Sequence, residues 1–267
     1  VPKCRCWATD TENKADIANL RTMGESPTVV THERQLGAQM VYDCSHSAHK
    51  DVSSRFAQAD QTLIRIEATH LPLEAKAELV GASVIPKLLY DTPVAPIAKR
   101  QLESWRTKAA RAIWGRGAPS RCLEVLFTLL SRGHRSDPLQ ASMCRILLCT
   151  RRMLKRYEDF QSVFWELLLD GVTLHNSHGP VARLQWALRT MGWSLAPEEG
   201  VWHFKRRNGL PFNFLVCDDG LVEHWAREAL RLAQWAQAER RRPDMEGIGA
   251  PQGVDRTATL AVLNKSR

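Results

Sequence analysis

The sequence predicts a mainly α-helical fold, with a small strand–helix–hairpin unit at the N-terminal end and one β-hairpin late in the chain. Two observations support this prediction. From Ser53 onward, apolar residues recur about every 3.6 positions, which is the spacing of one helix face. Near the other end, Asn208-Gly209 stands between two apolar runs, and this dipeptide is a strong signal for a hairpin turn.

The first 52 residues have mostly β character. We expect a strand at residues 3–9 and a helix at 16–23, which Gly24 closes. A second strand at 28–31, a polar turn at 32–35 and a third strand at 36–42 should follow. A unit this small cannot bury its own sheet, so we expect sheet neighbours upstream of Val1.

Residues 53–95 are expected to form two helices. The first places four apolar residues on one face: Phe56, Ala59, Leu63 and Ile66. Pro72 suits the first turn of the second helix. Pro86 should end or kink that helix because proline has no backbone N–H. Pro93 and Pro96 then indicate a linker.

Residues 96–242 are expected to form a basic helical region that contains the hairpin. Its first helix carries Leu102, Trp105, Ala109 and Ile113 on one stripe and stops at Gly115. Further helices are predicted at residues 120–130, 138–157, 159–168, 180–191 and 221–241, with a loop at 131–137 and the hairpin near 201–217. Residues 243–267 are expected to be a linker followed by a short helix or tail.

Composition favours an anionic partner. The chain has 267 residues, 44% hydrophobic and 25% charged, as in an ordinary soluble globular protein. Its formal net charge of +8 favours nucleic acid ahead of a membrane. A basic surface that binds no partner is an alternative of nearly equal weight. Seven cysteines without a tight framework indicate reduced thiols in an intracellular protein. No apolar run is long enough to predict a transmembrane helix.

Two patterns of potential metal ligands have simpler explanations. Cys4, Cys6, Cys44, His46 and His49 offer zinc ligands around the N-terminal hairpin, but Cys-x-Cys spacing is less typical of zinc sites than Cys-x-x-Cys. Half-buried thiols beside a polar, His-rich loop are therefore the favoured interpretation.

The second pattern is Asp218-Asp219, which follows an apolar strand as the carboxylates of a two-metal polymerase do. Gly220 and an amphipathic helix come next instead of a second strand. A helix N-cap is therefore the favoured role of this pair. We assign no catalytic residue and no metal ligand in this chain. Arg132-Gly133-His134-Arg135 likewise lacks the Lys-Ser/Thr and the preceding strand of a P-loop.

Basic clusters are the candidate nucleic-acid contacts, because cations along a helix face suit a phosphate backbone. The residues that we predict to contact nucleic acid are Lys99, Arg100, Arg106, Lys108, Arg111, Arg116, Arg121, Arg151, Arg152, Lys155 and Arg156. A further basic run, Lys205-Arg206-Arg207, lies at the hairpin turn and is open to either interpretation. The alternative is a solubilising surface with intrahelical pairs such as Glu223–Arg227.

The order of several segments resembles the reverse transcriptase of non-LTR (LINE-like) retrotransposons, in the part after the catalytic Asp-Asp hairpin. PKCRCWAT resembles the strand after that hairpin, and RQLGAQM resembles the primer-grip hairpin with its Leu-Gly. The helical segment RFAQADQTLIRIEATHLPLEAKAELVGASVIPKLLYD resembles the thumb, and LESWRTKAARAIWG resembles the basic helix that follows it. One departure is Tyr90-Asp91, where the family usually has Tyr-Gly.

The resemblance implies the end of a palm at residues 1–52, a thumb at 53–95 and a post-thumb region at 96–242. Gln35, Leu36 and Gly37 would lie near the primer end, and the basic helices would hold an RNA/DNA primer–template duplex. The fingers, the catalytic palm and its Mg²⁺ would belong to a missing upstream part of the same polypeptide, so we expect no cofactor in this chain.

A nuclear location follows if the resemblance holds. The alternatives are a stand-alone α-helical protein whose basic faces contact acidic proteins and, less favoured, a metal-dependent nuclease that uses Asp218 and Asp219.

Overall fold

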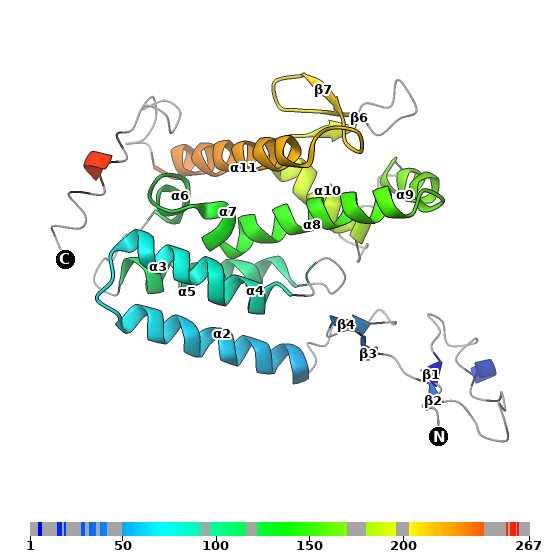
Figure 1. Cartoon of the computed structure of the whole chain (residues 1–267), viewed down its shortest axis with the longest axis horizontal. Helices are drawn as coiled ribbons and strands as arrows, with labels where there is room; N and C mark the ends of the chain where they lie inside the picture. The colour runs from blue at the N-terminus through cyan, green and yellow to red at the C-terminus, as the bar shows by residue number, and fades with distance from the viewer. Residues whose placement is uncertain are drawn as a thin grey trace.

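Figure 1 shows a computed structural model of the chain. The residues that it describes are 5–6, 15–17, 19, 28–29, 32–35, 38–41, 50–90, 92, 97–115, 122–169, 180–195, 203–242, 255, 257–259 and 261. The described part is mainly α-helical and has a small antiparallel sheet late in the chain, which confirms the predicted fold class.

Short strands form near the N-terminal end. Strand β1 (Arg5–Cys6) pairs in parallel with β2 (Thr28–Val29), and β3 (His32–Gln35) pairs antiparallel with β4 (Ala38–Val41). The turn predicted at His32–Gln35 is wrong, because all four residues pair with β4; strand pairing overrides the low strand propensity of such a polar segment. Leu36 and Gly37, the Leu-Gly of the hairpin, lie outside the described residues.

Helix α2 (Lys50–Ala68) has the predicted apolar face. Ala59, Leu63 and Ile66 are buried, and the ring centroid of Phe56 lies 5.5 Å from that of Trp105 in α5 (Lys99–Trp114). The predicted stripe of α5 is also buried, and the helix ends at Gly115 with a φ of 93°. A positive φ is readily available to glycine, which explains why the helix stops there.

The second predicted helix is interrupted rather than ended by Pro86. It consists of α3 (Leu73–Leu79), the π-helical segment η1 (Val80–Val84) and α4 (Ile85–Leu88). Because Pro86 has no N–H to donate four residues back, the regular ladder cannot continue unchanged. The π-helical turn just before it accommodates the disruption.

Between Leu123 and Arg241, the described part of the chain contains six further α-helices, one π-helical segment and three short strands. The first helical group is α6 (Leu123–Val125), η2 (Leu126–Leu130), α7 (Gly133–Ser136), α8 (Pro138–Arg156) and α9 (Phe160–Leu169). Then follow α10 (Pro180–Met191), β5 (Ser194–Leu195), β6 (His203–Lys205), β7 (Pro211–Asn213) and α11 (Asp219–Arg241). Helix α7 lies where a loop was predicted.

The late hairpin is confirmed, with Gly209 at a φ of 79° in its turn. Strand β5 extends the hairpin to a three-stranded antiparallel sheet in the order β5-β6-β7. The sequence did not predict β5, because two residues are too few to show a period.

Helix α8 is central to the helical layers (Figure 1), and it packs against α5, α10 and α11. Among the described residues, the buried apolar side chains from Ala59 to Ala238 form one hydrophobic core. The segments predicted as 53–95 and 96–242 therefore share a core. Within the ranges that the structure describes, no helix is both long and apolar enough to cross a membrane.

Candidate phosphate-binding groove

Arg106 was predicted to contact nucleic acid, and the structure corrects that assignment. Its side chain is only 5% exposed, and its Nε donates to Oδ2 of Asp137 at 2.9 Å. Its remaining donors face Gln234 of α11 and Glu124 of α6. A guanidinium held this way inside the core cannot reach a phosphate, so Arg106 has a structural role.

Arg151 needs the same correction. Its side chain is 2% exposed, and it donates to the carbonyl oxygens of Phe214, Leu215 and Cys217. It also pairs with Asp219. Arg151 therefore holds the segment that leads from β7 into α11 by donating to its backbone carbonyls.

The Asp218-Asp219 pair has the capping role that the sequence favoured. Oδ1 of Asp218 accepts from the backbone N–H of Leu221 at 3.1 Å, which makes Asp218 the N-cap of α11. Asp219 pairs with Arg151 and, at 3.0 Å, with Lys155. Within the described ranges, no three His, Cys, Asp or Glu side chains gather closely enough to hold a metal ion.

Several predicted contacts remain exposed. Lys99, Lys108, Arg111 and Lys155 pair with carboxylates at 2.8–3.8 Å, namely those of Glu103, Asp60, Glu67 and Asp219. Exposed pairs of this kind are weak, so their cations stay available to a phosphate. Arg100 and Arg152 are exposed on α5 and α8, and the Arg156 guanidinium lies 5.7 Å from the ring centroid of Tyr157.

Other predicted residues cannot be placed. Arg116, Arg121, Leu36 and Gly37 lie outside the described residues, as do Cys4, Cys44, His46 and His49 of the zinc hypothesis. Gln35 and Cys6 are described only as strand backbone. In the third basic run, the Arg206 guanidinium lies 4.2 Å from the ring centroid of Trp225.

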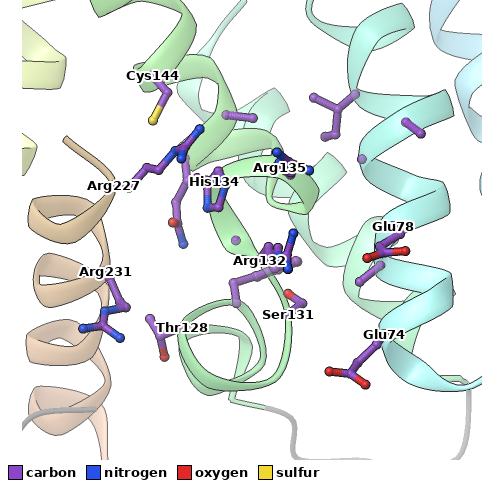
Figure 2. A pocket seen from close by; sticks show the side chains of 18 of the residues that line it. Glu74, Glu78, Thr128, Ser131, Arg132, His134, Arg135, Cys144, Arg227 and Arg231 are labelled. Atoms are coloured by element: carbon purple, nitrogen blue, oxygen red, sulfur yellow. The ribbon is translucent and has the colours of Figure 1, made fainter. Parts of the chain in front are cut away.

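The structure also contains a groove that the sequence analysis missed. It has a volume of about 1290 Å³ and lies between α3–η1, the η2–α7 segment, α8 and α11 (Figure 2). Five arginines line it: Arg132, Arg135, Arg145, Arg227 and Arg231. The other charged or titratable lining residues are Glu74, Glu78, His134, Cys144, Glu223, His224 and Glu228.

Close packing of backbone segments shapes the part of the groove lined by Arg132, Gly133, His134 and Arg135, which we call its floor. A Cβ atom on Gly133 would lie 2.2 Å from the carbonyl oxygen of Phe127, so the turn into α7 has room only for glycine. A Cβ atom on Gly81 would meet the carbonyl oxygen of Arg135 at 3.3 Å, so η1 also approaches α7 closely. These contacts fix the short helix that carries His134 and Arg135.

Burial and nearby arginines both affect the titratable groups of the groove. Burial, and then the charges of Arg227, Arg135 and Arg132, lower the pKa of His134 to about 4. The imidazole is therefore neutral at pH 7, mainly because it is buried and in addition because of these arginine charges. Burial raises the pKa of Cys144 to about 12, so this thiol is neutral as well.

The groove wall formed by α11 has unused hydrogen-bond donors. Arg227 pairs with Glu223 and Arg231 pairs with Glu228 through terminal guanidinium nitrogens. The buried Nε atoms of Arg227 and Arg231 have no acceptor in the part of the chain that the structure describes. Unsatisfied buried donors are costly, so a ligand that brings acceptor oxygens is favoured here.

Local sequence signals for this groove were present but separate. Arg227 and Arg231 are four residues apart and so share one helix face. Arg132 and Arg135 were considered only as a failed P-loop. Nothing in the sequence alone indicates that these two pairs, nearly a hundred positions apart, face the same groove.

Comparison with protein-family models, with curated proteins and with solved structures found no match. The likeness to retroelement reverse transcriptases therefore depends only on the segments quoted from the sequence.

Proposed function

We propose that this chain binds the phosphate backbone of nucleic acid, as the part of a retroelement reverse transcriptase that holds primer–template and lacks the catalytic centre. The observation that supports this most strongly is the convergence of arginines on one groove, two of them with buried Nε donors that lack an acceptor in the described residues. Arginine forks match phosphate oxygens in pairs, which makes them the common choice for this group.

Several properties favour a nucleic-acid backbone over a small ligand. The groove is larger than the roughly 300–1,000 Å³ of typical small-molecule pockets, so it suits an extended ligand. Phe127 is buried beneath the Arg106 guanidinium, which leaves no exposed aromatic carbocycle among the lining residues for a base to stack on. The groove therefore favours phosphates over bases.

The two walls of the groove differ in charge. Glu223 and Glu228 pair with Arg227 and Arg231 and so orient them. Glu74 and Glu78 come from α3 on the opposite wall (Figure 2) and would repel a phosphate. A backbone in the groove would therefore lie against α7 and α11, and Arg152 and Lys155, further along α8, would extend the contact outside it.

The retroelement part of the proposal is supported by the order of the quoted segments and by the helices that form within residues 53–95. On this proposal Gln35, Leu36 and Gly37 lie near the primer end of an RNA/DNA duplex, and the protein acts in the nucleus. The Mg²⁺-dependent chemistry belongs to an upstream palm. The purified chain should then incorporate no nucleotide, and measurable incorporation would contradict the assignment of a missing centre.

The test is the affinity of the chain for a fluorescent RNA/DNA hybrid duplex. Arg132→Glu/Arg135→Glu should weaken binding by about tenfold or more, because each reversal removes a phosphate contact and adds repulsion. The matched control is Arg65→Glu/Arg189→Glu, which changes the net charge equally at exposed positions outside the groove. Equal losses in both variants would show that only net charge matters, and absent binding would refute the function.

The competing class, a helical protein that binds acidic proteins, predicts that nucleic-acid affinity is unchanged by charge reversal at Lys108 and Arg111. Arg106, which the sequence predicted to contact nucleic acid, is unsuitable for this test because reversal of a buried charge would disrupt the fold.

A further inference from the structure

We propose that the floor of the groove is a subsite for one phosphate group, held by Arg132, Arg135 and Arg227, and that His134 takes up a proton when the phosphate binds. The inference rests on the proposed function, because it assigns the ligand of the same groove. It goes further because it names the chemical group that the subsite recognises and because it couples the binding of that group to proton uptake by His134.

The arrangement of side chains around His134 supports a single anion-binding position. Figure 2 shows His134 between Arg227, which comes from α11, and Arg132 and Arg135, which flank it at α7. Arg132 and Arg135 are exposed, whereas the Nε of Arg227 is buried without an acceptor among the described residues. A tetrahedral oxyanion has oxygens in several directions, so it can accept from guanidinium groups that arrive from different elements.

Proton uptake follows from the charges around the imidazole. In the free protein, burial and then the charges of three arginines disfavour a positive His134. A bound dianion offsets these arginine charges and offers an acceptor to an imidazole N–H, so the charged form of His134 becomes more favourable. Linkage is reciprocal, so the anion must bind more tightly as the pH falls toward the pKa of His134 in the complex.

Other titratable groups line the groove from each element that surrounds it. Helix α3 contributes Glu74 and Glu78, and α8 contributes Cys144 and Arg145. Helix α11 contributes Glu223, His224, Glu228 and Arg231. His224 is the second imidazole that lines the groove. Its substitution is therefore the matched control.

The experiment measures sulfate binding to the full chain by calorimetry at about pH 8 and about pH 6, because sulfate remains a dianion over this range whereas phosphate titrates. We expect the affinity for sulfate to rise by about threefold to tenfold as the pH falls. This increase corresponds to a rise of the pKa of His134 toward the ordinary histidine range in the complex. His134→Gln should remove this pH dependence, and His224→Gln should keep it. Arg132→Gln, at an exposed position, should weaken sulfate binding at both pH values.

The outcomes separate this inference from the proposed function. No sulfate binding, equal affinity at the two pH values, or a pH dependence that survives in His134→Gln would overturn the subsite. The same proteins are titrated with the RNA/DNA duplex. Duplex binding without sulfate binding would refute only the subsite, whereas pH-linked sulfate binding without duplex binding would refute only the nucleic-acid function.

Discussion

The Nε of Arg106 lies 2.9 Å from Oδ2 of Asp137, although 31 positions separate these residues in the chain. Both side chains are buried, and Arg106 also donates to Gln234 of α11. Burial raises the pKa of Asp137, and the charge of Arg106 opposes that effect. One cation thus connects α5 with the start of α8 and with α11, and both α8 and α11 contribute to the lining of the groove.

Breaking this pair should destabilise the fold strongly. Arg106→Leu leaves the Asp137 carboxylate buried without its charged partner, and the expected loss is about 3–5 kcal/mol in the free energy of unfolding. Arg100→Leu, at an exposed position of the same helix, should change it by less than about 0.5 kcal/mol. Urea denaturation measures both, and similar small losses would contradict the structural role of Arg106.

Neighbouring arginines of α8 should differ in function. Arg151→Ala removes the donor to three carbonyls between Phe214 and Cys217, and it should cost about 3 kcal/mol of stability. Arg152→Ala should leave stability unchanged and weaken duplex binding instead. Thermal unfolding and duplex titration of both variants check this. If Arg151→Ala weakened duplex binding and Arg152→Ala lowered stability, Arg151 would be a nucleic-acid contact instead.

Glycine at position 133 should be a steric requirement. The added Cβ of Gly133→Ala would lie 2.2 Å from the backbone oxygen of Phe127, so the segment must shift at a cost of about 1–3 kcal/mol or more. Gly81→Ala meets the oxygen of Arg135 at 3.3 Å and should cost less. If denaturation shows the opposite order, the close approach of η2 to α7 is not as described.

His134 should make the fold sensitive to acid. Its pKa is about 4 in the folded chain against an ordinary value of 6.5, so between these values the unfolded chain binds a proton that the folded chain excludes. The stability that the neutral imidazole contributes is fully present above about pH 6.5 and falls by up to about 1.4 kcal/mol per pH unit toward pH 4. The difference in unfolding free energy between the wild type and His134→Gln should follow this course. A difference that stays constant with pH would contradict it.

Local patterns were sufficient to predict most helices. The stripe of Leu102 and Ala109, the end of α5 at Gly115 and the cap at Asp218 all follow from short-range rules of spacing and backbone conformation. The burial of Arg106 also had a local signal. It lies four residues after Leu102 and three before Ala109, which is the spacing of the buried face rather than of an exposed one.

The rest depends on contacts between distant segments. The partners of Arg106 and Arg151 come from α6, α11 and the turn after β7, so no window of sequence shows that these cations are neutralised. The groove has the same origin, since α3, α7, α8 and α11 each supply only part of its lining. Strand β3 was misplaced because its polar residues become a strand only through pairing with β4.

The salt dependence of duplex affinity tests the central claim most directly. For binding to phosphates, the logarithm of the association constant falls linearly with the logarithm of salt concentration, with a slope set by the number of phosphates contacted. We predict a steep slope for the wild type and a slope that is shallower by about 2 for Arg132→Gln/Arg135→Gln. A salt-independent affinity, or an identical slope in the variant, would contradict the account of the groove as a phosphate-backbone site.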